Sequence, residues 1–334
     1  MRPFGYLRPA SVAEAVRAAA ENPGARFLGG GTNLVDLMKL GVETPGVLID
    51  VTRLPLDRTE PTPEGGLRIG ATVRNSDLAA HPFVRQHYPV LTQALLAGAS
   101  GQLRNVATTG GNLLQRTRCP YFQDVSKPCN KRVPGTGCPA REGAHRDLAV
   151  LGHSESCVAT HPSDLSAALA ALGATVLLHG PEGERAVPLA GFHRLPGENP
   201  DQDTVIRPGE LITAVTLPPS PEGSEQLYRK VRDRASYAFA LVSVAAVLTV
   251  RDGHVRHAAL AYGGLAHRPW RAITAEAVLR GAPATAETFA RAADTELAAA
   301  RPLRDNAFKV GLARRLTVDV LTELTGRTAA SRSV

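Results

Sequence analysis

Two glycine-rich turns contain residue types that could bind a phosphate group. The first runs from Gly29 to Asn33 and follows a short apolar run, and the second runs from Thr108 to Asn112. Because glycine has no Cβ, such turns tolerate left-handed backbone angles and let several N–H groups point at one anion. A helix that begins near Asn33 would add the positive end of its dipole. The alternative for the first turn is a tight strand-to-helix connection without a ligand, whereas two similar turns favour the two ends of one diphosphate.

All four cysteines follow the second turn within one glycine- and proline-rich segment: Cys119, Cys129, Cys138 and Cys157. Such clustering is what four thiolate ligands on one centre require. Nine, eight and eighteen residues separate successive cysteines, and the paired C-x-x-C knuckles of a zinc ribbon are missing. From the spacing alone, an iron–sulfur cluster, a structural zinc ion and disulfides all remain open.

Three motifs in a fixed order resemble those of a known family. The stretches 29–33, 69–73 and 109–112 correspond to the GG-x-T, I-G-A-x-T and T-x-G-G-N motifs in the flavin-binding subunit of the xanthine dehydrogenase / molybdenum hydroxylase family. The resemblance extends from residue 4 to about residue 324. It implies an α+β fold, with a two-subdomain FAD-binding domain of the vanillyl-alcohol-oxidase-like type followed by a smaller α+β C-terminal domain.

The resemblance also implies which residues contact FAD. Most belong to the two turns and their neighbours: Phe27, Leu28, Gly29, Gly30, Gly31, Thr32, Asn33, Leu34, Gly101, Thr108, Thr109, Gly111 and Asn112. Asp164 corresponds to an aspartate at the ribityl or phosphate region, Ile206 to a side chain against the isoalloxazine ring, and Lys230 to a lysine near the reduced ring. The alternatives are a helix-dipole contact for Asp164, a core position for Ile206 and a solvent-facing strand position for Lys230.

The cysteine segment resembles one branch of the family, the three-subunit aldehyde oxidoreductases of the bacterial periplasmic type. In that branch the flavin subunit carries a [4Fe–4S] cluster in an insertion, and the stretches beginning at Cys119, Cys129 and Cys157 match it. The resemblance therefore implies that residues 116–157 form the insertion and that all four cysteines are cluster ligands. Basic residues such as Lys131 flank the cysteines, and positive charge near a cluster raises its reduction potential.

Composition excludes several classes of function. The net charge of +7 comes mainly from arginines scattered among acidic residues, and only 4% of residues are aromatic, which argues against nucleic-acid binding. No apolar run approaches the length of about eighteen residues that a membrane span needs. The N-terminus shows no apolar h-region or twin-arginine motif, which favours the cytoplasm. Export to the periplasm with a signal-bearing partner is the alternative that the related aldehyde oxidoreductases suggest.

Local patterns predict the elements that position these residues. A capping box beginning at Ser11 starts a helix, and strands at 25–28 and 47–51 flank the first turn in βαβ order, which predicts parallel pairing. Ser163 is expected to cap a helix whose first turn contains Asp164.

The domain boundary is expected at the proline- and glycine-rich stretch 218–223. The sequence therefore predicts an FAD-binding domain over residues 1–219 and a C-terminal domain over 224–326. In the latter, a hairpin turns at Asp252-Gly253 and two helices, at 284–300 and 306–324, finish the fold. Residues 327–334 are expected to be a disordered tail.

The resemblance implies an electron-transfer subunit of a heterotrimer. It would move electrons from a partner [2Fe–2S] subunit and a molybdenum-cofactor subunit through FAD to an external acceptor. No catalytic acid–base residues are expected, because electron transfer requires the protein to position cofactors and tune their potentials. Two alternatives are a flavin subunit of a benzoyl-CoA-type reductase and a zinc-stapled interaction protein with vacant glycine turns.

Overall fold

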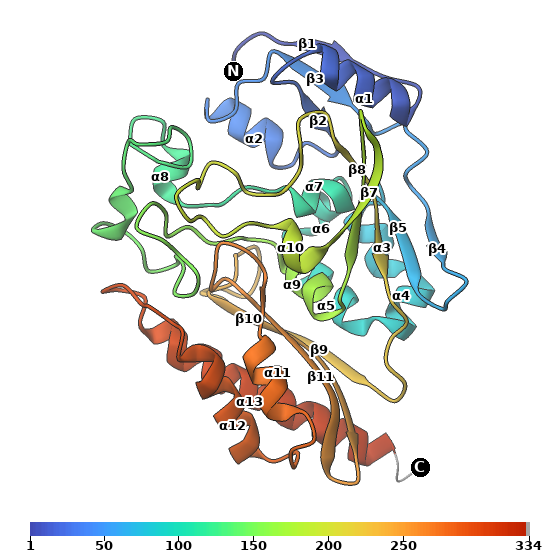
Figure 1. The fold of residues 1–334 in the computed structure, drawn as a ribbon, viewed down its shortest axis with the longest axis vertical. Coiled ribbons are helices and arrows are strands. Elements are labelled where there is room, and N and C mark those ends of the chain that lie inside the picture. The colour runs from blue at the N-terminus through green and yellow to red at the C-terminus, as the bar shows by residue number, and fades with distance from the viewer. Residues whose placement is uncertain (332–334) are drawn as a thin grey trace.

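A small parallel sheet positions the first glycine turn. The computed structural model describes residues 1–331, and Figure 1 shows this sheet at one end of the molecule. Strands β1 (Gly5–Leu7), β3 (Val47–Asp50) and β2 (Arg26–Leu28) pair in parallel with β3 in the middle, which confirms the predicted unit. Helix α1 (Val12–Glu21) is capped by the Ser11 side chain, and α2 (Leu34–Lys39) starts directly after the turn.

A five-stranded antiparallel sheet forms the body of the first half of the fold. Its strands lie in the order β4 (Thr59–Pro61), β5 (Leu67–Gly70), β8 (Leu211–Leu217), β6 (Thr175–Gly180) and β7 (Gly183–Pro188). The helices around it are α3 (Asn75–Ala80), α4 (Pro82–His87), α5 (Pro89–Ala97), α6 (Gly101–Arg104), α7 (Thr109–Leu113), α9 (Asp164–Ala171) and α10 (Leu189–Phe192). Apolar side chains of the sheet and of several of these helices join in one large core cluster.

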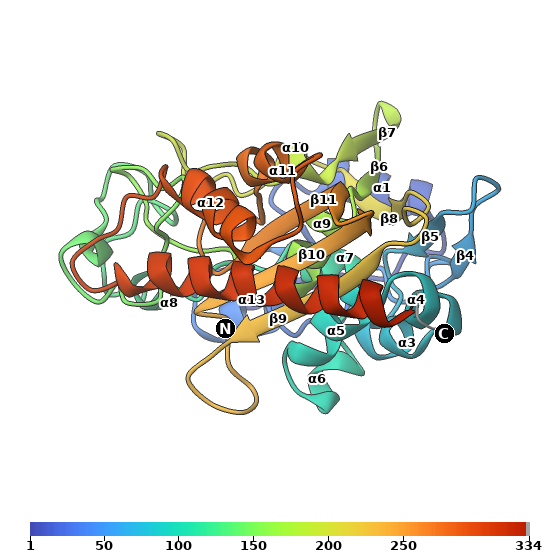
Figure 2. The same ribbon diagram turned by 90° about the horizontal axis from the view of Figure 1, so that it is seen from below.

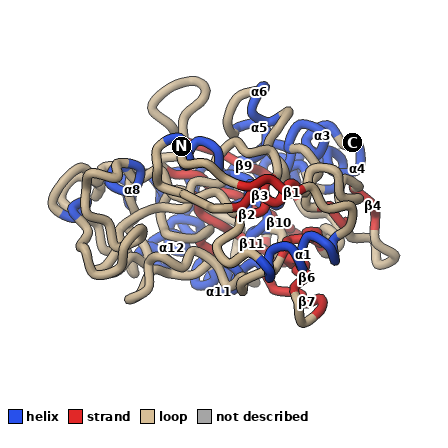
Figure 3. Tube along the Cα trace, turned by 90° about the horizontal axis from the view of Figure 1, so that it is seen from above, coloured by secondary structure: helices blue, strands red, loops and turns tan. Residues whose placement is uncertain are grey.

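The segment between α7 and α9 contains little regular structure. It holds only α8 (Pro120–Gln123) and a 3-10 turn over Pro139–Arg141, and Figure 3 shows the chain around α8 almost entirely as loop. A small apolar cluster of its own, which Leu37 of α2 joins, lies inside this segment. The four cysteines therefore lie on loops that pack on one another rather than on a sheet.

A four-stranded antiparallel sheet forms the second half of the fold. Its order is β12 (Trp270–Arg271), β11 (His254–Gly263), β10 (Val242–Arg251) and β9 (Glu225–Val231). The predicted hairpin is confirmed, since β10 and β11 are joined by Asp252 and Gly253, both with positive φ. Helices α11 (Ile273–Leu279), α12 (Ala286–Leu297) and α13 (Phe308–Ser331) pack against this sheet, and Figure 2 shows α13 running along it.

Alternate residues of β10 face two different cores. Val244 and Ala246 belong to the cluster formed with α11, α12 and α13, whereas Ala245 and Val247 belong to the core cluster that includes α5 and α9. Because successive side chains of a strand point to opposite faces, one sheet joins the two halves of the chain. The predicted α+β class is confirmed.

The C-terminal helix is longer than the sequence indicated. It continues to Ser331, so the expectation of disorder from residue 327 is wrong for residues 327–331. Arg327 pairs with Glu323 one turn earlier, and no proline ends the helix, which explains its continuation. Residues 332–334 lie outside the described residues. Within residues 1–331, no helix combines the length and apolar character needed to cross a membrane.

Candidate functional site

The two glycine turns are in direct contact with each other. A Cβ built on Gly30 would lie 2.0 Å from the Val106 carbonyl oxygen, and one on Gly29 would lie 2.7 Å from the Thr108 Oγ1 atom. Gly31 has a φ of +71°, a left-handed angle that favours glycine. Close packing of backbone on backbone thus explains why the first turn consists of glycines, and it fixes the two turns as one unit.

Asn33 ends the first turn and lines a cleft, with one of its two amide atoms lacking a partner among the described residues. Its Oδ1 atom accepts a hydrogen bond from the Arg116 backbone N–H at 2.8 Å. Its Nδ2 atom is buried and has no hydrogen-bond partner among residues 1–331, and neither has the Oδ1 atom of Asn75, which lines the same cleft. Buried polar atoms normally have partners, so these two atoms indicate a polar ligand.

The cleft has a volume of about 490 Å³ and lies where the two turns, α5, α9 and the loop at 234–239 meet. Five of the predicted FAD contacts line it, namely Thr32, Asn33, Gly111, Asn112 and Asp164. At its edge, Ser163 caps α9 by accepting from the Ser166 N–H, as predicted, and its hydroxyl donates to the Asn112 Oδ1 atom at 2.6 Å. The start of α9 and the second turn are thereby tied together.

The other predicted contacts do not line this cleft. They are Phe27, Leu28, Gly29, Gly30, Gly31, Leu34, Gly101, Thr108, Thr109, Ile206 and Lys230. Thr109 is fully buried and donates to the Val73 carbonyl, and Ile206 packs against the core cluster. These residues shape the turns or the core behind the cleft, so their direct contact with FAD stays a prediction.

Asp164 and Lys230 are brought together as a buried ion pair. The Lys230 Nζ atom lies 2.7 Å from the Asp164 Oδ2 atom, and their side chains are 3% and 8% exposed. The Tyr228 hydroxyl donates to the other carboxylate oxygen, and burial together with this carboxylate raises the pKa of Tyr228 well above its usual value. Lys230 therefore neutralises Asp164, and the solvent-facing alternative for Lys230 is wrong because β9 turns this side chain inward.

Three cleft residues lie on a loop that the sequence did not single out. Arg234, Tyr237 and Phe239 follow β9 and line the cleft, where the Arg118 guanidinium lies 5.0 Å from the Phe239 ring centroid. The one available signal was the position of Arg118 directly before Cys119. No local pattern in 234–239 indicates a ligand, since the loop reaches the cleft only through tertiary packing.

A second cleft of about 330 Å³ adjoins the first on the side of the cysteine segment. The two share Arg118, Pro162, Asp164, Ala238 and Phe239, and the second extends to Pro120, the neighbour of Cys119 in the sequence. The two clefts together therefore reach from the second glycine turn to the start of the cysteine segment.

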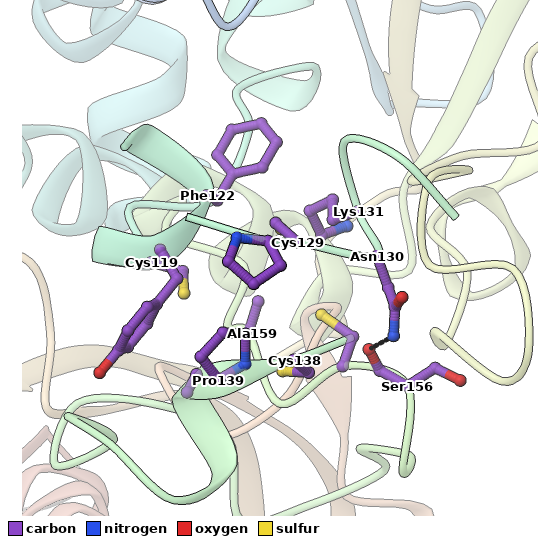
Figure 4. Close-up of a pocket in the computed structure, with 13 residues that line it drawn as sticks. Cys119, Phe122, Cys129, Asn130, Lys131, Cys138, Pro139, Ser156 and Ala159 are labelled. Carbon is purple, nitrogen blue, oxygen red and sulfur yellow. Dashed lines mark hydrogen bonds between the residues drawn. The ribbon is translucent and has the colours of Figure 1, made fainter. Parts of the chain in front are cut away.

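The four cysteines surround one small cavity. All of them line a space of about 10 Å³ together with residues such as Phe122 and Lys131, and all four are free thiols. Figure 4 shows this cavity, with the labelled Cys119 at the start of α8 and the labelled Cys129 and Cys138 on the loop that follows α8. Within the described part of the chain, no three histidine, cysteine or acidic side chains are placed to hold one metal ion. The disulfide alternative is not realised in this structure.

The electrostatics of this cavity favour a positively charged occupant over free thiolates. Burial, together with the neighbouring thiols, raises the pKa of Cys119 to about 11 and that of Cys157 to about 12. Burial likewise raises the pKa of Cys138. Four sulfur donors on one dry cavity suit an iron–sulfur cluster, since the positive charge of the irons would stabilise the thiolate forms.

Comparison with known proteins identifies relatives along the whole chain. The model of the FAD binding domain in molybdopterin dehydrogenase matches residues 2–220, and that of the CO dehydrogenase flavoprotein C-terminal domain matches residues 226–324. The aldehyde oxidoreductase FAD-binding subunit of Escherichia coli is 57% identical over 97% of this chain and 98% of its own length. A putative xanthine dehydrogenase FAD-binding subunit of E. coli is 26% identical over 95% and 94%. A carbon monoxide dehydrogenase chain of Hydrogenophaga pseudoflava superposes with a TM-score of 0.77 at 27% identity over 98% and 99%.

Proposed function

The chain belongs to the FAD-binding medium subunits of the molybdenum hydroxylase family, and from that premise we propose that it is an electron-transfer subunit with two cofactors. FAD occupies the cleft beside the glycine turns, and a [4Fe–4S] cluster is bound by Cys119, Cys129, Cys138 and Cys157. Electrons pass between partner subunits and an external acceptor. The division into domains at 1–219 and 224–326 is part of this proposal.

Support for the flavin site comes from the polar atoms of the cleft. The unpartnered Asn33 Nδ2 atom and the side chains of Thr32 and Asn112 offer hydrogen bonds where the two turns meet. These groups would hold the diphosphate, and the Asp164 carboxylate, already neutralised by Lys230, would orient the ribityl chain. FAD, when bound, supplies the exchange between one-electron and two-electron carriers.

Support for the cluster site comes from the donor set. Four free thiols from three successive connections of the segment line one cavity, and the buried Lys131 lies beside them. Cys119 and Cys157 are buried, and burial of part of a cluster strengthens the effect of nearby charges.

The observation that carries the proposal is the second cleft, which adjoins the flavin cleft and reaches the start of the cysteine segment. The second cleft begins at Asp164 on the flavin side and ends at Pro120, next to Cys119. Two electron carriers exchange electrons efficiently only when they are close. A flavin cleft that adjoins a second cleft lined by Pro120, the neighbour of Cys119, supports such a short separation.

The partners and substrate follow from the relatives. We propose a heterotrimer with a [2Fe–2S] subunit and a molybdenum-cofactor subunit, in which an aldehyde or aromatic heterocycle is oxidised on the molybdenum subunit. The 57% identity to an aldehyde oxidoreductase subunit favours an aldehyde. The reverse electron flow of a benzoyl-CoA-type reductase is the second candidate from sequence, and no feature of the structure favours it.

The test is anaerobic purification with the neighbouring subunits, followed by flavin, iron and zinc analysis and EPR spectroscopy of the reduced protein. One FAD and about four irons assignable to this chain would support the proposal. FAD with one zinc ion would remove the cluster and keep the flavoprotein. A protein without flavin absorbance would overturn the proposal.

A further inference from the structure

Asp203 pairs with two basic residues that lie between the two proposed cofactor sites, Lys131 and Arg116. It lies on the loop between α10 and β8, and its carboxylate accepts from Lys131 through Oδ1 and from the Arg116 Nε atom through Oδ2, the latter at 2.8 Å. Lys131 and Arg116 are 72 and 87 residues away from Asp203 in the sequence. The three charges therefore meet only in the folded chain.

Lys131 brings a positive charge to the cysteine cavity. Its side chain is 1% exposed, lines the cavity, and also donates from Nζ to the Pro200 carbonyl at 2.7 Å. All four cysteines line this same cavity. Lys131 is thus close enough to the sulfur atoms to act on their charge.

Arg116 brings the second positive charge and connects it to the flavin side. Its guanidinium lies 4.7 Å from the ring centroid of Phe122, which lines the cysteine cavity, and pairs with Glu43 at 2.7 Å. Its backbone N–H donates to Asn33 in the first turn. Since Glu43 offsets the charge of Arg116, Asp203 is the acidic partner that remains for Lys131.

The histidines beside Asp203 are neutral near pH 7. His161, His193 and His267 line a small polar cavity with Asp203 and Lys131. Burial lowers the pKa of His193 and His267 to about 4 and lowers that of His161 well below its usual value. Burial alone would raise the pKa of Asp203, but the positive charges of Lys131 and Arg116 outweigh it and keep the carboxyl ionised.

We infer that Asp203 is a positioning residue for the cluster: its carboxylate holds the Lys131 ammonium at the cysteine cavity and offsets its positive charge. This inference rests on the proposed function, because it concerns the reduction potential of the proposed cluster. Reduction adds one electron to the cluster, so an uncompensated positive charge nearby stabilises the reduced form. Removing Asp203 and removing Lys131 must therefore shift the potential in opposite directions.

The experiment is potentiometry of the intact complex, followed by EPR of the cluster and by flavin absorbance. Asp203→Asn is expected to shift the cluster potential to a more positive value, and Lys131→Met to a more negative value, with iron and flavin content unchanged. Asp203→Glu keeps the negative charge and should leave the cluster potential close to that of the wild type. The matched control is Glu210→Gln. Glu210 lies on the same loop as Asp203, directly before β8, and its buried carboxylate pairs with Arg185 of β7. It lines neither proposed cofactor site.

Each outcome decides the inference. Unchanged potentials in both variants, or shifts of the same sign, would overturn it, and so would a shift in Glu210→Gln as large as that in Asp203→Asn. Loss of iron from Asp203→Asn would show that the residue holds the fold rather than the charge balance. A wild-type complex without four irons in this chain would instead overturn the proposed function.

Discussion

The flavin cleft and the cysteine cavity are built in different ways. The cleft lies at the ends of regular elements, including α5, α7 and α9, which pack on the large core cluster. The cavity lies in a segment with one four-residue helix and one 3-10 turn, over a cluster of only eight buried residues that includes two of the cysteines themselves. The cleft is therefore supported by the fold, whereas the cavity has little apolar support of its own.

Side chains take the place of secondary structure around the cavity. Arg132 donates to the backbone carbonyls of Tyr121 and Phe122, and Asn130 donates to that of Ser156 while accepting from the Gly137 N–H. Because each of these loop contacts holds only a few residues, binding of a metal centre is expected to contribute much of the order of the cysteine segment. We therefore expect the flavin cleft to form without FAD, whereas the cysteine cavity needs its metal to keep its shape.

The largest expected effect is a loss of the metal from the cysteine cavity without a loss of FAD from the cleft. Cys138 is only partly buried, so Cys138→Ala removes a ligand with little change in packing. We expect nearly all iron to be lost, because a cluster needs its full ligand set, while FAD content stays at the wild-type level. Iron and flavin analysis of the purified complex measures both. Full retention of iron would contradict the assignment of Cys138 as a ligand.

The ion pair under the cleft gives the next largest effect. Lys230→Met leaves the Asp164 carboxylate buried without its partner, which is expected to cost about 3–5 kcal/mol in the free energy of unfolding. Urea denaturation followed by circular dichroism measures this. The double variant Lys230→Met/Asp164→Asn removes both charges and should recover much of the loss. A single-variant loss below about 1 kcal/mol would mean that the pair is not desolvated.

The first glycine turn can be tested with a matched pair of alanine substitutions. Gly30→Ala places a methyl group 2.0 Å from the Val106 carbonyl oxygen, whereas Gly46→Ala, outside both turns, meets no atom within 4 Å. Overpacking against backbone typically costs about 1–3 kcal/mol, so Gly30→Ala should weaken FAD binding by roughly tenfold or more. Flavin titration of the deflavinated complex gives the affinities. Equal affinities of the two variants would show that the contact between the turns does not shape the flavin site.

The smallest expected effect is a pH dependence from the histidines between the two regions. In the folded chain the pKa values of His193 and His267 are lowered to about 4 by burial, below the value of about 6.5 in an unfolded chain. The unfolded state therefore binds more protons below pH 6.5, and stability falls as the pH falls. Between pH 7.5 and 6 we expect a loss of about 1 kcal/mol for each histidine.

The measurement of this effect is urea denaturation at several pH values. His193→Gln should give a lower stability at every pH but a shallower slope, since one titrating group is removed. An identical slope in the variant and the wild type would count against the assignment of the effect to His193.

Much of the fold could be predicted because it follows from neighbours in the sequence. The βαβ order gave the parallel pairing of β1, β2 and β3, and turn residues gave the hairpin at Asp252 and Gly253. The caps at Ser11 and Ser163 depend on residues three positions away. The end of α13 was missed, since the helix continues through Gly326 to Ser331 instead of ending at residue 324.

The sequence by itself determined the types of groups available for chemistry: two glycine turns, four clustered cysteines and the charged residues between them. Only the tertiary structure decided how those groups are paired. It turned Lys230 onto Asp164, packed Ile206 against the core and joined Lys131, Asp203 and Arg116 into one charge network. The physical reason is that turns and caps depend on backbone preferences within a few residues, whereas these contacts join residues more than 60 positions apart and exist only once the sheets and loops have packed.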